Sequence, residues 1–122
     1  MKVLLVDDDP DQLAIRAMLL AQSGFQTISA ADAGAALAAA VAQKPACALI
    51  DLRLPTEADG LRLIRTLKET DPAILLIVLT GGNPAKLKLC PESKLIEEVI
   101  VKGGSSAYLV GRLRSLARRA RS

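Results

Sequence analysis

The sequence has no histidine and no tryptophan, and Phe25 and Tyr108 are its only aromatic residues. Its two cysteines, Cys47 and Cys90, form no CxxC pair and have no histidine to act with, which excludes the common zinc motifs. We expect both to be reduced thiols in a cytoplasmic protein. Because the basic carboxyl-terminal residues have only Tyr108 for base stacking, direct nucleic-acid binding is not expected.

Long hydrophobic runs are missing as well. No segment has the length of a membrane span, and the amino-terminal MKVLLV is too short for a signal peptide. No membrane contact is therefore predicted. The chain has 122 residues, of which 51% are hydrophobic, and this size and composition predict a single domain over 1–122 with an aliphatic core.

Charge is distributed unevenly along the chain. The formal net charge is +3, yet every charged residue after Glu98 is basic. A basic terminal helix is usually only a solvated face, and docking of an acidic protein partner is the alternative that this pattern leaves open. The arginines that would form the docking face are Arg112, Arg114, Arg118, Arg119 and Arg121.

Short apolar runs alternate with segments of helical periodicity. Strands are predicted over 2–6, 25–29, 46–50, 73–79 and 98–101, and helices over 10–23, 33–43, 60–70 and from about 105 to 120. Asp9 before Pro10 is an N-cap signal, as is Asp32, and Gly24 suits a left-handed helix end. Five strands that alternate with helices predict an α/β fold, a doubly wound five-stranded parallel sheet with helices on both faces.

Two connections are less regular in this prediction. The residues TEAD, at 56–59, are expected to form a loop that leads to the helix at 60–70. Pro84 and Pro91 leave room for only a turn or two between them, so the fourth helix is expected to be short or irregular. Few residues of that segment are expected to reach the core.

Polar residues stand where the apolar runs end. Asp7 and Asp8 follow the first strand, Asp51 the third, Thr80 the fourth and Lys102 the fifth. Each has a structural explanation of its own, such as an acidic helix start or a solvated strand end. Because the carboxyl ends of parallel strands meet at one edge of a sheet, we expect these side chains to lie together.

This set suits the transfer of a phosphoryl group onto a carboxylate. Three converging acids favour a hard divalent cation, and Mg²⁺ commonly takes one or two carboxylates together with phosphate oxygens and waters. A cation there neutralises an incoming phosphoryl group. Thr80 can donate a hydrogen bond to one phosphoryl oxygen, and Lys102 can form an ion pair with another.

Four motifs resemble those of bacterial response-regulator receiver domains of two-component signalling, the CheY-like family. They are VDDD at 6–9, DLRLP at 51–55, TGG at 80–82 and VK at 101–102. The resemblance covers the whole chain and implies a flavodoxin-like sheet of strand order 2-1-3-4-5. It also implies a phosphorelay partner, either a sensor histidine kinase or a phosphotransfer protein, and a downstream protein target that the sequence does not name.

The resemblance implies a role for each matching residue. Asp51 matches the phospho-acceptor of the family, and Asp7 and Asp8 match its acidic Mg²⁺ pair. Arg53 stands where a backbone carbonyl binds the metal. Thr80 matches the switch hydroxyl, and Lys102 matches the lysine that contacts phosphate. Such a protein is not an enzyme with a separate substrate, since it catalyses only its own phosphorylation and dephosphorylation.

Some positions depart from the family pattern. Gly103 replaces the proline that usually follows the lysine, and Val99 replaces an aromatic residue three positions before it. The output is therefore expected to differ, and a pseudo-receiver that serves only as a binding module is one alternative. A haloacid-dehalogenase-type phosphatase is another, because Asp7 and Asp9 form a D-x-D after the first strand, with Asp7 as nucleophile.

Overall fold

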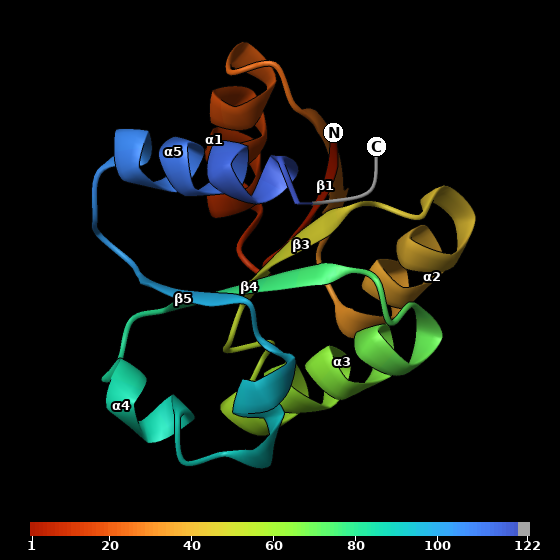
Figure 1. The fold of residues 1–122 in the computed structure, drawn as a ribbon, viewed down its shortest axis with the longest axis vertical. Helices are drawn as coiled ribbons and strands as arrows, with labels where there is room; N and C mark the ends of the chain where they lie inside the picture. Colours follow the sequence, from red (N-terminus) through yellow and green to blue (C-terminus); the bar gives the residue numbers. More distant parts are fainter. Residues whose placement is uncertain (120–122) are drawn as a thin grey trace.

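The computed structural model describes residues 1–119 and contains a five-stranded sheet in which all neighbouring strands are parallel (Figure 1). The strand order is β2-β1-β3-β4-β5, so the predicted fold class and order are confirmed. The strands are β1 (Lys2–Val6), β2 (Gln26–Ala30), β3 (Cys47–Asp51), β4 (Leu75–Thr80) and β5 (Glu98–Val101).

Helices cover both faces of this sheet, as predicted. Figure 1 shows α1 and α5 on one face and α2, α3 and α4 on the other. The fourth helix is short, as expected from its prolines, and a 3₁₀ helix, η1, follows it. The helices are α1 (Pro10–Gln22), α2 (Ala33–Gln43), α3 (Glu57–Thr70), α4 (Pro84–Leu87), η1 (Pro91–Leu95) and α5 (Ser106–Ala117).

Strand β3 shows how the sheet separates two aliphatic cores. All its residues are buried; Cys47 and Leu49 face the core under α1 and α5, whereas Ala48 and Ile50 face the core under α2 and α3. A parallel strand that is covered on both faces needs such a continuous apolar run. Burial raises the pKa of the Cys47 thiol to about 12, which makes this cysteine an inert core residue.

The turn between β1 and α1 follows the predicted capping signals. The Asp9 side chain accepts hydrogen bonds from the backbone N–H groups of Asp11 and Gln12, and Pro10 occupies the first helical turn. Gly24 ends the helix with φ +93°, a conformation that suits glycine. Helix α1 is therefore fixed directly after Asp7 and Asp8.

Helix α3 begins earlier than predicted, and the expected loop at 56–59 is wrong. Thr56 is the N-cap; its hydroxyl oxygen accepts from the Asp59 N–H, while the Asp59 carboxylate accepts from the Thr56 N–H. This capping box satisfies two backbone donors at the helix start. The hydrogen bond from the Thr56 hydroxyl lowers the pKa of Asp59. Gly60 thus lies inside the first turn of α3.

The segment around α4 is anchored through a single buried side chain. Leu87 is the one residue of the described segment 81–93 that is buried, and it lies in the core under α2 and α3, so the expectation that few residues of this segment reach the core is confirmed. On the opposite face, Arg112 and Arg119 of the basic end form ion pairs with Glu98 and Glu97. Arg121 and Ala120 lie outside the described residues. None of the described helices has the length and apolar character that crossing a bilayer requires.

Candidate functional site at the carboxyl edge of the sheet

The predicted site residues stand at the carboxyl edge of the sheet. Asp7 directly follows β1, and its backbone N–H donates to Ala30 at the end of β2. Asp51 and Thr80 are the last residues of β3 and β4. Lys102 follows β5, and its N–H donates to the Thr80 carbonyl at 2.8 Å. The strand register therefore determines how these side chains converge.

Three carboxylates form one acidic cluster. Asp7, Asp8 and Asp51 each place a carboxylate oxygen within 4.8 Å of the others. Asp7 and Asp51 are buried, whereas Asp8 is exposed. Ligands that are all oxygen suit a hard divalent cation. Because Asp8 is exposed, solvent can reach the cluster and supply the waters that such a cation keeps. The cluster is thus a candidate metal site.

A hollow of about 200 Å³ opens beside this cluster. It is lined by Asp51, Leu52, Arg53, Glu57, Thr80, Gly81, Gly82 and Lys102. The Lys102 Nζ lies 2.7 Å from Asp51 Oδ2, and this ion pair brings the lysine to the Asp51 carboxylate. Thr80 Oγ1 accepts from the Gly82 N–H at 3.1 Å, which leaves its hydroxyl proton able to donate into the hollow.

Asp51 belongs to both arrangements. Its carboxylate is a member of the acidic cluster and also lines the hollow with Thr80 and Lys102. Only 6% of Asp51 is exposed, and its orientation is held by the Arg53 N–H, which donates to Oδ1 at 3.2 Å. The Arg53 carbonyl accepts no backbone hydrogen bond within residues 1–119. It remains able to act as a metal ligand.

Asp7 is the most enclosed of the three acids. It is 1% exposed, and its Oδ1 accepts from the Asp9 N–H at 2.9 Å. Its Oδ2 accepts from Nη1 of Arg16 at 2.6 Å. Arg16 was not predicted as a site residue. Gln12 and Arg16 are four residues apart in α1 and share one helix face, but this spacing does not identify Asp7 as the partner of Arg16.

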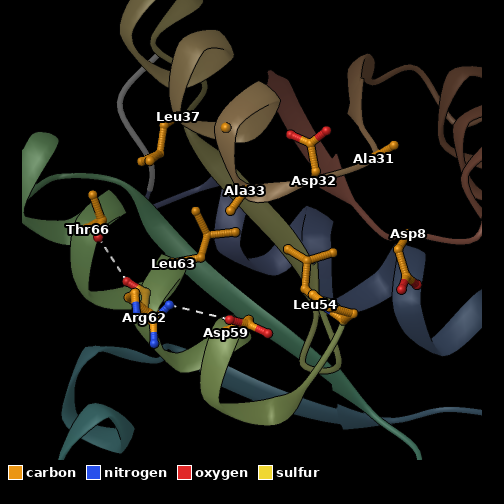
Figure 2. A pocket seen from close by; sticks show the side chains of 12 residues that line it. Asp8, Ala31, Asp32, Ala33, Leu37, Leu54, Asp59, Arg62, Leu63 and Thr66 are labelled. Carbon is orange, nitrogen blue, oxygen red and sulfur yellow. Dashed lines mark hydrogen bonds and ion pairs between the residues drawn. The ribbon is translucent and has the colours of Figure 1, made fainter.

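A larger pocket of about 550 Å³ lies between α2 and α3 (Figure 2). Its interior is mainly apolar, with Leu37, Leu54 and Leu63, and small residues of the alanine-rich α2 leave the space open. Asp8 lies at its edge, apart from the Arg62–Asp59 pair (Figure 2). Asp51, Thr80 and Lys102 do not line this pocket, so it is not the place where the predicted phosphoryl-transfer residues meet.

Residues 3–114 match the family described as the response regulator receiver domain. The chain belongs to this family. The receiver domain resembles the transcriptional regulatory protein PrrA of Mycobacterium tuberculosis, with 31% identity over 118 residues that cover 97% of this chain and 50% of PrrA. It also resembles the photosynthetic apparatus regulatory protein RegA of Rhodovulum sulfidophilum, with 40% identity over 79 residues, 65% of this chain and 43% of RegA.

The receiver domain spans about half the length of the curated relatives that it matches. Solved structures agree with the fold. A CheY-like receiver domain from Methylobacillus flagellatus matches with a TM-score of 0.81 at 26% identity, covering 95% of this chain and 98% of that one. A receiver domain protein from Clostridium thermocellum matches with a TM-score of 0.87 at 20% identity, covering 97% and 94%.

Proposed function

We propose that this receiver domain takes part in a phosphorelay by accepting a phosphoryl group on Asp51. The observation that carries the proposal is the double position of Asp51, which lies in the acidic cluster and lines the hollow together with Thr80 and Lys102. Phosphoryl transfer depends mainly on positioning and charge stabilisation. Asp51 has both a nearby metal-ligand set and nearby donors for phosphoryl oxygens.

The step forms one bond and breaks another. A carboxylate oxygen of Asp51 attacks phosphorus, the bond from phosphorus to the donor breaks, and the donor atom keeps the bonding electron pair. With a phosphorylated histidine the broken bond is P–N, and with acetyl phosphate it is P–O. Lys102 then exchanges its contact with Asp51 Oδ2 for one with a phosphoryl oxygen, and the Thr80 hydroxyl donates to another.

Mg²⁺ is the metal that we propose for the acidic cluster. The ligands would be Asp8, Asp51 and the Arg53 carbonyl, with Asp7 acting mainly through water. All donor atoms are oxygens, which fits this ion. When bound, Mg²⁺ supplies positive charge that neutralises the incoming phosphoryl group. Asp8 is suited to be a direct ligand because it is exposed and forms no ion pair among residues 1–119.

The partners follow from this chemistry. The phosphoryl donor would be a sensor histidine kinase or a phosphotransfer protein, and the output would be contact with a downstream protein rather than direct nucleic-acid binding by this chain. The domain would act only on itself and not as an enzyme with a separate substrate. A cytoplasmic location suits such an exchange. PrrA and RegA are regulatory proteins, which agrees with a signalling role.

The two alternatives are less well supported. A phosphatase with Asp7 as nucleophile would need space and hydrogen-bond donors for a phosphoryl group beside Asp7. The hollow that Thr80 and Lys102 line is bordered by Asp51 and not by Asp7, and Asp7 is only 1% exposed. A pseudo-receiver would not need the acids, the hydroxyl and the lysine to converge, yet all of them do. The geometry therefore favours a working phospho-acceptor.

Incubation of the wild-type protein with acetyl phosphate and magnesium chloride should add one phosphoryl group per chain, measured by intact mass. The same incubation in a metal chelator should add none, because the cation neutralises the charge that develops in the transfer. Peptide mapping after borohydride trapping should place the modification at Asp51. Modification at Asp7 would instead support the phosphatase alternative, and no modification at all would contradict the proposal.

Asp8→Ala should weaken Mg²⁺ binding by at least about a hundredfold, since outer-shell changes alone commonly cost tenfold to a hundredfold. The fold should survive because Asp8 is exposed. Isothermal titration calorimetry with magnesium chloride measures the affinity, and far-ultraviolet circular dichroism checks the fold. Asp11→Ala, an exposed acid two residues into α1, is the matched control. Equal affinities in the two variants would exclude Asp8 as a ligand.

A further inference from the structure

Arg16 is the basic residue of α1 that contacts the acidic cluster. Its Nη1 lies 2.6 Å from Asp7 Oδ2, and its side chain is 13% exposed. Its Nη2 donates to Gln12 Oε1 at 3.4 Å, so the guanidinium is held against the side of the helix. Arg16 is separate from the hollow that contains Asp51, Thr80 and Lys102. Among residues 1–119, its hydrogen bond and ion pair with the site are made to Asp7.

Two cations compensate the three carboxylates when no metal is bound. Arg16 pairs with Asp7, and Lys102 pairs with Asp51, whereas Asp8 faces solvent. Without Arg16, the buried Asp7 would lose its charged partner beside two other acids, which is costly in a poorly solvated place. Arg16 therefore stabilises the metal-free protein.

The same charge opposes an incoming cation. A divalent ion at the cluster would carry its charge close to the Arg16 guanidinium, and like charges repel at this range even with partial screening. Affinity for the metal is the difference in free energy between the loaded and the metal-free protein. A residue that stabilises the metal-free protein and repels the ion in the loaded one must lower that affinity.

We propose that Arg16 is a positioning residue that acts through Asp7 as an internal counter-ion and sets Mg²⁺ affinity below the value the three carboxylates would give alone. The inference rests on the metal site of the proposed function. It assigns to Arg16 a role that the matching motifs do not include. The domain would consequently respond to magnesium over a higher concentration range, and a larger share of molecules would be metal-free at a given concentration.

Arg16→Gln tests this by removing the charge while keeping a hydrogen-bond donor for Asp7. Titration calorimetry with magnesium chloride should show binding about tenfold tighter than in wild type, which corresponds to about 1.4 kcal/mol. In chelator, the melting temperature of the variant should be lower than that of wild type. Saturating magnesium should reduce this difference in melting temperature. The difference in affinity should shrink at high ionic strength.

Two further variants separate charge from structure. Arg16→Lys keeps the charge and should bind magnesium with nearly wild-type affinity. Arg112→Gln removes an arginine of α5 that is paired with Glu98 of β5, and it controls for the loss of one positive charge elsewhere. Its magnesium affinity should stay within about twofold of wild type, because exposed charges at a distance are screened.

The outcomes can be distinguished from failure of the proposed function. If Arg16→Gln binds magnesium no more tightly than wild type and Arg112→Gln, while wild type still takes up phosphate, the counter-ion role is wrong and the proposed function stands. Weaker binding in Arg16→Gln would likewise overturn it. If none of the proteins binds magnesium, both proposals fail. If Arg16→Gln does not fold in chelator, the Arg16→Lys variant tests the counter-ion role instead. A lower magnesium affinity in Arg16→Lys than in wild type would show that the shape of the arginine side chain, and not its charge, determines the affinity.

Discussion

Asp51→Asn is expected to abolish phosphate uptake from acetyl phosphate. The asparagine amide has nearly the same shape as the carboxylate but has no anionic oxygen to attack phosphorus. It also has no charge to pair with Lys102, which lies 2.7 Å away in the wild-type protein. Intact mass after incubation with acetyl phosphate and magnesium should show one phosphoryl group per chain for wild type and none for the variant.

The variant should remain folded, which makes the result interpretable. Removing one charge relieves repulsion within the acidic cluster, and the Lys102 amine is partly exposed and can be hydrated. Asp11→Asn is the matched control, because Asp11 is an exposed acid at the start of α1, and it should take up phosphate like wild type. Uptake by Asp51→Asn equal to that of the control would show that another residue is the acceptor.

The sheet and the positions of its polar strand ends could be predicted because both depend on local patterns. The buried run 46–50 and the run before Thr80 have the length and composition of central parallel strands, and residues after parallel strands must meet at one edge. The strands at β1 and β5 were also predicted with the bounds that the structure gives. Because the parallel strands pair side by side, the polar residues at their carboxyl ends come together at the site.

What could not be predicted depends on contacts between elements. The pairing of Arg16 with Asp7 requires α1 to lie against the carboxyl end of β1 at one rotation about the helix axis. Helical spacing limits that rotation but does not identify the side chain that Arg16 contacts.

The start of α3 was predicted incorrectly for a different reason. Thr56 and Asp59 form a T-x-x-D capping signal, but Gly60 was interpreted as the first residue of the helix.

Gly60 has a structural role that its sequence context does not reveal. It lies in the first turn of α3, where the helix passes directly over the backbone of Leu52. A Cβ at this position would lie 1.9 Å from the Leu52 carbonyl oxygen and 2.8 Å from its carbonyl carbon. Neither atom belongs to a flexible side chain, so the helix and the strand end would have to move apart.

Gly60→Ala should therefore destabilise the protein by at least about 3 kcal/mol, at the upper end of overpacking effects, because the clash is with backbone. Gly111→Ala is the matched control. Gly111 is exposed in the middle of α5, a Cβ there meets nothing within 4 Å, and alanine should stabilise by about 0.5 to 1 kcal/mol. Urea unfolding followed by circular dichroism measures both changes.

The clash between a Cβ at position 60 and Leu52 would lie next to Asp51, so it should affect the site as well as the stability of the fold. Leu52 directly follows Asp51, and Arg53 both holds the Asp51 carboxylate and lines the hollow. A helix displaced from Leu52 would move the turn that orients the Asp51 carboxylate, so folded Gly60→Ala should also take up phosphate more slowly than Gly111→Ala. If the free energy of unfolding of Gly60→Ala is within about 1 kcal/mol of wild type, α3 does not approach Leu52 as closely as described. Normal uptake in a destabilised variant would instead show that the orientation of Asp51 does not depend on this contact.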